Sequence, residues 1–214
     1  MSDVFPRWTN QLPLKIVAGG LLLGVSAVAG VWYYFTPDYT RVGYQPIQPV
    51  GFSHNIHVEQ LGMDCRYCHN GVETSWYSNV PASSVCMNCH NQVLKDDPKL
   101  ALVRESAASA APGKPIPWVQ IHKLADYAYF NHAVHVNRGV SCVHCHGQLN
   151  QMDEVAQAKP LGMTFCLQCH RQPEAFLRPP AEVYNLNWQP ESQAKQLADG
   201  AKWVKEWNVK RLEN

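Results

Sequence analysis

Charged residues are scarce in this sequence, and neither sign of charge is in clear excess. They make up 16% of the 214 residues, whereas hydrophobic residues make up 46%. An average globular protein has about a quarter of its residues charged, and disordered chains combine high charge with low hydrophobicity, so we expect a folded chain. The net charge is only +1. Because no basic field is present to hold a phosphate backbone, nucleic acid is excluded as a partner.

Charge is missing altogether from one stretch near the N-terminus. Residues 16–33 form an 18-residue run without a charged side chain. With its apolar neighbours the run is just long enough to cross a bilayer as a helix. Trp8 precedes it and residues 32–35 (WYYF) close it, as aromatic belts do at membrane interfaces. We therefore expect a single membrane-spanning helix here.

The flanks of this run indicate its orientation. Arg7 and Lys15 precede it, which predicts a cytoplasmic N-terminus and places residues 36–214 outside the cytoplasm. A cleaved signal peptide is the alternative, because residues 27–29 (AVA) resemble a small-residue cleavage site. We expect the segment to be retained as an anchor.

Composition and repetition divide the rest of the chain. A neck rich in proline and tyrosine follows the anchor, and helical periodicity is clear only near the C-terminus, at Leu197, Ala201, Val204 and Trp207. The expected segments are a tail and anchor at 1–38, a first module at 39–112, a second module at 113–180 and a helical extension at 181–214.

An internal repeat occupies the two modules. The pattern F-x-H-x-x-H occurs at residues 52–57 and again at 130–135, and two C-x-x-C-H motifs follow each copy. Corresponding histidines and cysteines of the two copies lie 77 to 80 residues apart. A near-constant offset over several landmarks indicates a duplicated module.

All eight cysteines belong to four motifs of one kind, so none is left over. Each C-x-x-C-H motif matches the attachment sequence of c-type haem, in which two thiols join the two vinyl groups of a porphyrin and the histidine ligates the iron. The predicted thioether residues are Cys65, Cys68, Cys86, Cys89, Cys142, Cys145, Cys166 and Cys169, and the predicted proximal ligands are His69, His90, His146 and His170. We expect four covalently bound haem c groups, two in each module.

Zinc sites and disulfides are the alternatives for these cysteines. Seventeen residues separate Cys68 from Cys86 and twenty separate Cys145 from Cys166, which fits two four-cysteine zinc sites. A histidine nevertheless follows all four pairs, and zinc sites complete with cysteine would not need it. Disulfides within C-x-x-C would close very small loops and stabilise little. Haem is the favoured interpretation.

Electron-transfer haems need a second axial ligand, and six histidines remain for this role. In a helical turn, side chains three positions apart share a face but diverge, so each F-x-H-x-x-H element can serve a haem of its own and a neighbouring one. We expect four distal ligands from the two elements, namely His54, His57, His132 and His135.

Other side chains are weaker candidates for axial ligation. His122 lies just ahead of the second repeat, without a counterpart in the first, and is kept as a further candidate ligand. His144 sits inside its own attachment motif and is poorly placed to reach another iron. Met63, Met152 and Met163 lie near the motifs, where a packing role is expected.

The length outside the anchor limits the kind of core this protein can build. Residues 36–214 offer 179 residues for four haems, or about 45 for each, which is too few for separate helical cores. The porphyrins must therefore supply the core. The expected fold is mainly α with much irregular structure, made of one N-terminal transmembrane helix and a domain packed around four haems.

Two family resemblances extend this interpretation. The F-x-H-x-x-H element followed by C-x-x-C-H resembles the class III multihaem cytochromes c. A fuller pattern is similar to the multihaem cytochrome subunit (ActA) of alternative complex III. It comprises the first two attachment motifs and residues 52–54, 118–122, 126–132 and 163–171. That subunit as usually described carries five haems, whereas this chain has cysteines for four.

The resemblance implies an electron-transfer subunit that is not catalytic alone. Its partners would be iron–sulfur and quinol-binding subunits of a membrane complex, and its acceptor a periplasmic soluble cytochrome c or copper protein. The implied location is the inner membrane, with a single pass and a periplasmic haem domain. A stand-alone tetrahaem quinol dehydrogenase is the main alternative. A multihaem reductase is disfavoured, because no C-x-x-C-K motif occurs and spare histidines outnumber open iron sites.

Overall fold

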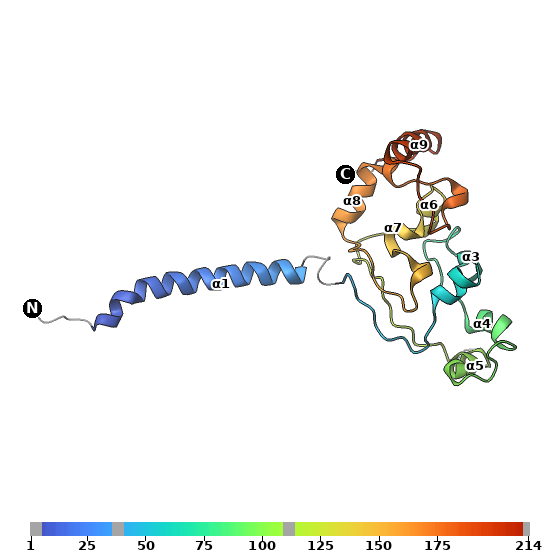
Figure 1. Cartoon of the computed structure of the whole chain (residues 1–214), viewed down its shortest axis with the longest axis horizontal. Coiled ribbons are helices and arrows are strands. Elements are labelled where there is room, and N and C mark those ends of the chain that lie inside the picture. Colours follow the sequence, from blue (N-terminus) through green and yellow to red (C-terminus); the bar gives the residue numbers. More distant parts are fainter. Residues whose placement is uncertain (1–5, 36–40, 109–113, 212–214) are drawn as a thin grey trace, which may run out of the picture. The chain divides into compact units, whose positions relative to one another are not determined.

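Helices are the main regular structure of the computed structural model, which describes residues 6–35, 41–108 and 114–211 (Figure 1). In this part of the chain no strand occurs, and a lone antiparallel bridge pairs Val140 with Leu177. The chain forms two compact units, residues 1–42 and 43–214. The expectation of a mainly helical fold with much irregular structure is confirmed.

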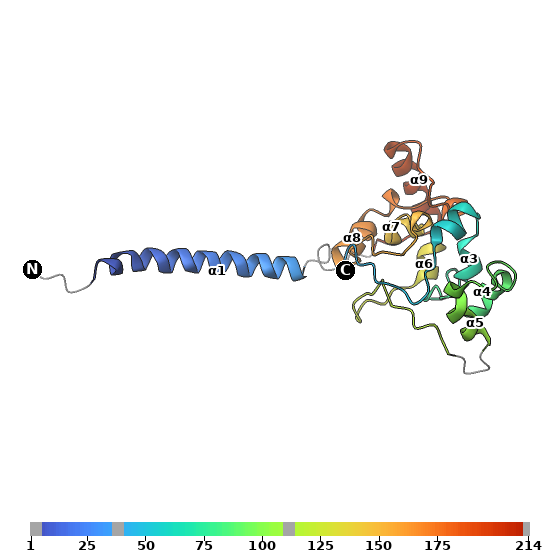
Figure 2. The same ribbon diagram turned by 60° about the horizontal axis from the view of Figure 1, so that its bottom comes forward.

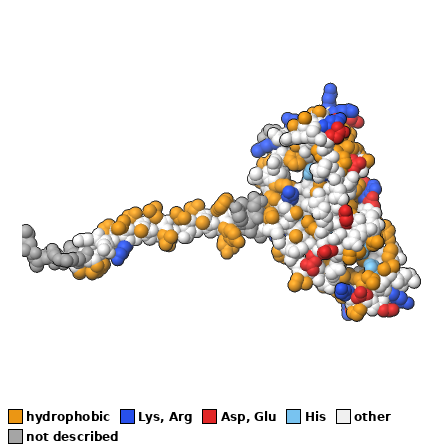
Figure 3. Space-filling view, viewed as in Figure 1, with side chains coloured by type: hydrophobic (Ala, Val, Ile, Leu, Met, Phe, Trp, Pro, Cys, Tyr) orange, Lys and Arg blue, Asp and Glu red, His pale blue; other side chains and the backbone are white. Residues whose placement is uncertain are grey.

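The first unit is one long apolar helix. A 3₁₀ turn, η1 (Arg7–Gln11), leads into α1 (Leu12–Phe35). Within the 28 residues Trp8–Phe35, the most apolar 18-residue window reaches a mean hydropathy of 2.0, and none of it is buried within the protein. At 1.5 Å per residue, the 24 residues of α1 span about 36 Å, against about 30 Å for the hydrocarbon layer of a bilayer. Hydrophobic side chains cover α1 along its length (Figure 3), so by length and composition it can cross a membrane.

The second unit is built from short helices joined by extended chain. Its α-helices are α3 (Cys65–Cys68), α4 (Ser83–His90), α5 (Ala101–Ala108), α6 (His132–Val136), α7 (Cys142–His146), α8 (Met163–Arg171) and α9 (Gln193–Glu206). A π-helical turn, η2 (Asn55–Gln60), and 3₁₀ turns η3 (Pro98–Leu100), η4 (Leu149–Gln151), η5 (Pro173–Ala175) and η6 (Pro180–Glu182) complete it. Helices α4 and α5 lie side by side in both ribbon views (Figures 1 and 2).

Side-chain caps begin several of these helices. The carboxylate of Asp64 accepts a hydrogen bond from the Arg66 amide at the start of α3, and Asn131 accepts one from Val134 at the start of α6. Such caps satisfy amides that have no partner within the helix. They fix the first turn of helices too short to be stable alone, and these turns carry the cysteines and histidines of the site.

The aliphatic core of the second unit is small. Six of its buried apolar side chains form two clusters, one at Val50, Val103 and Ile116 and the other at Val72, Val136 and Val183. The unit instead encloses a cavity of about 680 Å³, within the range of about 300–1,000 Å³ typical of cofactor sites. This agrees with the expectation that the protein does not build its core from side chains alone.

The packed face of the C-terminal helix α9 differs in part from the face that its apolar pattern predicts. The buried residues of α9 are Gln196 and Gly200, whereas Leu197 and Ala201 of the expected stripe are exposed. Gln196 donates from Nε2 to the carbonyl oxygens of Glu174 and Leu177, at 3.0 and 2.7 Å. In the N-terminal half of α9 the packed face is therefore rotated by one residue, because hydrogen bonding and close backbone approach determine it, while Val204 and Trp207 of the stripe are half-buried as expected.

The segment boundaries predicted at 38/39 and 112/113 fall in or beside residues that the structure does not describe, as does the start of the neck at 36–40. The division of residues 39–214 into two dihaem modules and an extension stays a prediction.

Candidate haem sites

The central cavity brings together the first and third attachment motifs. Its walls include both cysteines and the histidine of each motif, and the distal candidates of both repeats also line it: His54, His57, His132 and His135. The cysteines of the second and fourth motifs do not line this cavity; they lie within α4 and α8, and the histidine of each motif comes in the last turn of its helix. The duplicated sequence is thus matched by a repeated arrangement, with the first motif of each module at the cavity.

Three pairs of histidines face each other at a common distance. The ring centroids are 6.1 Å apart for His57 and His90, and 6.1 Å apart for His135 and His170. The rings of His132 and His146 lie 6.4 Å apart and nearly parallel, at 9°. Metal–nitrogen bonds of about 2 Å on each side, with the distance from each nitrogen to its ring centre, put the centroids of two trans ligands about 6 Å apart. Each pair could hold one iron.

Backbone carbonyls orient most of these rings. In His57, Nδ1 lies 2.8 Å from the backbone oxygen of Ser53, and in His135 it lies 2.7 Å from the backbone oxygen of Asn131. The two repeats therefore use equivalent partners. Nδ1 of His69, His90 and His132 likewise lies 2.6 to 3.1 Å from a carbonyl oxygen. When Nδ1–H donates a hydrogen bond, the lone pair of Nε2 is left to bind a metal, as in most histidine ligands.

The phenylalanine of each F-x-H-x-x-H element orients both of its histidines. Phe52 stacks on His57 at 4.4 Å, and Phe130 stacks on His135 at 4.5 Å. Each ring also meets the first histidine of its element edge-on, at 4.9 and 4.7 Å. Sequence reasoning treated these phenylalanines only as part of a pattern. Their repetition at the same offset was the signal that could have identified them.

Burial favours the neutral form of two histidines at the cavity wall. It lowers the pKa of His54 to about 4 and that of His146 to about 3, where neighbouring histidines add to the effect. The buried Nδ1 of His54 has no hydrogen-bond partner within the described residues. Neutral imidazoles are the form that binds metal.

The eight cysteines are free thiols in intermediate or exposed positions. Burial raises the pKa of Cys142 to about 12 and that of Cys145 and Cys169 to about 11. Among the described residues, no three side chains of histidine, cysteine, aspartate or glutamate come together as a metal-binding group. The cysteines are therefore not arranged as the four-thiolate zinc sites considered above.

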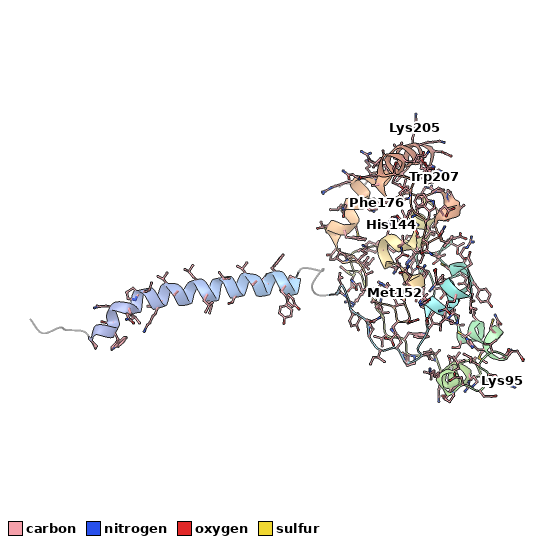
Figure 4. All side chains as sticks on the ribbon, viewed as in Figure 1. Lys95, His144, Met152, Phe176, Lys205 and Trp207 are labelled. Atoms are coloured by element: carbon pink, nitrogen blue, oxygen red, sulfur yellow. The ribbon has the colours of Figure 1, made fainter. Side chains whose placement is uncertain are left out.

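The remaining candidates are not paired in this way. Nε2 of His122 is 3.3 Å from Nδ1 of His146, with ring centroids 4.3 Å apart. His144 packs edge-on against Phe176 at 5.6 Å (Figure 4), and burial lowers its pKa to about 4. Met163 is 65% exposed.

The residues present fit covalently attached haem. Each motif offers two thiols and an imidazole on one turn, three of the four motif histidines face a second imidazole, and a largely apolar cavity lies between two of the motifs. The unpartnered, buried Nδ1 of His54 lies at the wall of the same cavity.

Comparison with known proteins gives two matches. The family model for cytochrome c7 and related cytochromes c matches residues 50–109 and 128–197. The multihaem cytochrome c subunit of a menaquinone reductase from Nitratidesulfovibrio vulgaris is 35% identical over 142 residues. That match covers 64% of this chain and 64% of the relative, so the chain spans somewhat less than two thirds of the relative's length. Each stretch matched by the family model contains one F-x-H-x-x-H element and two attachment motifs, and His122 lies between the stretches.

Proposed function

The chain belongs to the family of cytochrome c7 and related cytochromes c, and from this we propose that it is a membrane-anchored tetrahaem electron-transfer subunit. Haem c supplies an iron that accepts and releases one electron. The observation that carries the proposal is the pairing of histidines. In both repeats the second histidine of F-x-H-x-x-H faces the histidine of the second attachment motif, at 6.1 Å.

In this proposal each haem has two histidine ligands. The second haem uses His90 and His57, the third His146 and His132, and the fourth His170 and His135. The repeat assigns His54 to the first haem, opposite His69, because His54 is the counterpart of His132. Two imidazoles on every iron leave no open position for a substrate, which suits conduction and not catalysis.

The positions of the motifs suggest the order of the haems. The first and third motifs share one cavity, so their haems form a central pair. His54 and His57 lie three residues apart in one element and tie the second haem to the first, while His132 and His135 tie the fourth to the third. We infer the order second, first, third, fourth, with electrons entering and leaving at the two ends.

Helix α1 is proposed to anchor this conductor in the inner membrane, with a cytoplasmic N-terminus and a periplasmic haem unit. Gly20 and Gly24 lie on one face of α1 with Val28 and Trp32. Small residues four apart allow helices to approach closely in lipid, which favours a membrane-embedded partner. Between residues 16 and 35 no acid, histidine or arginine is available for quinol chemistry.

We propose that partner subunits provide the quinol-binding and iron–sulfur sites, as in alternative complex III. Electrons would then leave to a soluble cytochrome c or copper protein. A second candidate reverses the flow, because the relative is named as a subunit of a menaquinone reductase. The haem order serves either direction, since a chain of haems conducts both ways.

Purification and reduction of the full-length protein test this proposal. Mass spectrometry should find four haem additions, and gentle extraction of native membranes should recover quinone-linked subunits. Expressed alone, the chain should react slowly with a menaquinol analogue, whereas the intact complex reacts fast. Fast reduction of the isolated chain would favour a stand-alone quinol dehydrogenase. Reduction of added menaquinone by the complex would favour the reverse flow.

A further inference from the structure

His122 is one histidine more than the four haems need as ligands. The two F-x-H-x-x-H elements already provide four second ligands. His122 has no counterpart in the first repeat, and it lies outside both stretches that match the family model. It nevertheless lies at the wall of the central cavity, in contact with His146.

The geometry of this contact does not suit ligation of the same iron. The rings of His122 and His146 meet edge-to-face at 89°, with centroids 4.3 Å apart, which leaves no room for a metal between them. His122 approaches Nδ1 of His146, at 3.3 Å. The ring that faces His146 at the distance of a trans ligand is His132, at 6.4 Å.

We propose that His122 is a positioning residue for His146. Its Nε2 accepts a hydrogen bond from the Nδ1–H of His146, which fixes the tautomer and the ring plane and leaves Nε2 of His146 to bind iron. The inference rests on the proposed function, because it requires a haem on His146. Five other proposed ligands have a backbone carbonyl near Nδ1, whereas His146 has an imidazole in that place.

The segment that carries His122 is held in place. Gln48 donates from Nε2 to the Val119 oxygen and accepts from the Val119 amide through Oε1, both at 2.9 Å. Gln120 donates to the His122 oxygen at 3.0 Å. An acceptor fixed in this way restricts rotation of the His146 ring, which is half-buried at the wall of the cavity.

This arrangement predicts an electronic effect on one haem. An acceptor at Nδ1 makes the imidazole a stronger electron donor, which favours the oxidised iron and lowers its potential. The near-parallel rings of His132 and His146, at 9°, also distinguish this haem from those with rings at 60° and 67°. Near-parallel imidazole planes give rhombic low-spin electron paramagnetic resonance (EPR) signals, whereas strongly tilted planes give very anisotropic ones, so the signal of this haem differs from those of the second and fourth haems.

Two variants of the full chain test the inference, each checked by mass spectrometry for four haems. His122→Phe removes the acceptor, and His122→Gln keeps a side-chain oxygen that can accept. In His122→Phe we expect every haem to stay low-spin, the rhombic signal to shift, and the potential of that one haem to rise. A tenfold change in its oxidised-to-reduced ratio corresponds to about 59 mV for one electron. His122→Gln should restore most of the wild-type potential.

Other outcomes would overturn it. A high-spin haem in either variant would show that His122 is an axial ligand. An unchanged potential and rhombic signal in His122→Phe would show that His122 does not position His146. Should His122→Phe fail to load haem, His122→Gln decides alone, since a low-spin haem near the wild-type potential supports the inference and a high-spin one refutes it. Failure of the proposed function would appear separately, as a wild-type chain without haem.

Discussion

At the scale of single residues, one aromatic ring controls two proposed ligands in each repeat. Phe52 stacks on His57 and meets His54 edge-on, and Phe130 does the same for His135 and His132. In the proposed assignment, the stacked histidine serves the second haem of its module and the edge-on histidine serves the first. A single side chain therefore fixes the divergence that lets one helical turn serve two haems.

Removing one stacked histidine should affect a single haem. In His57→Ala the second haem loses the ring that faces His90, so we expect one haem of the four to become high-spin. Optical and EPR spectra of the full-length protein measure this change. His144→Ala is the matched control, because His144 packs on Phe176 and faces no motif histidine, and its haems should stay low-spin. Four low-spin haems in His57→Ala would contradict the ligand assignment.

The buried His144 predicts a pH dependence of stability. Burial lowers its pKa from 6.5 to about 4, so between these values the unfolded chain binds a proton that the folded chain does not. Its contribution to stability is present above pH 6.5 and is lost as the pH falls toward 4. From pH 7 to pH 5 this loss is about 2 kcal/mol. Urea unfolding of the haem-loaded protein at both pH values should show a smaller loss in His144→Gln, and equal losses would exclude the effect.

At the scale of elements, α9 shows why an apolar pattern can indicate the wrong face. Leu197 is 41% exposed although it starts the apolar stripe, whereas Gln196 and Gly200 are buried against η5. Trp203 and Trp207 stack on each other at 5.6 Å and 2°. Periodicity correctly predicted the helix. Its packed face depended on carbonyl groups of η5 and Leu177, which no local pattern in α9 reveals.

Gly200 tests this account of α9. An alanine in a helix is normally more stable than glycine by about 0.5–1 kcal/mol. At this position a Cβ would collide with the backbone oxygen of Glu174. We therefore expect Gly200→Ala to destabilise the haem unit by about 1–3 kcal/mol, as overpacking does. Thermal unfolding measures the change, and Ala201→Ser on the exposed side of the same helix should stay within about 0.5 kcal/mol. Stabilisation by Gly200→Ala would show that α9 does not pack closely here.

At the scale of the whole molecule, the sequence predicted what is local and repeated. The long apolar helix near the N-terminus, the scarcity of regular structure and the small core follow from runs, motifs and length. The pairing of the second histidine of each element with its module's second motif was not predictable, because it depends on how η2 and α6 are turned toward α4 and α8. The contact of His122 with His146 joins an extended segment to α7 across 24 residues of sequence, and spacing does not indicate it.

The shared cavity predicts that the first and third haems influence each other's potential. His54, His69 and His146 line one largely apolar cavity, where charges are screened less than at the surface. Methionine as axial ligand raises the potential of a haem, so in His54→Met the first haem is reduced earlier. When the third haem is then reduced, its neighbour already carries one positive charge fewer. The potential of the third haem should therefore fall. Its rhombic EPR signal allows this potential to be followed separately.

The matched control for this coupling is His57→Met, which alters the second haem. In the inferred order the second haem is not a neighbour of the third, and His90 does not line the central cavity. Its earlier reduction should therefore shift the rhombic signal much less than His54→Met does. Equal shifts in the two variants would contradict a central pair, and a larger shift in His57→Met would place the second haem beside the third. A shift confined to His54→Met would support conduction through the central pair, with partners docking at the second and fourth haems.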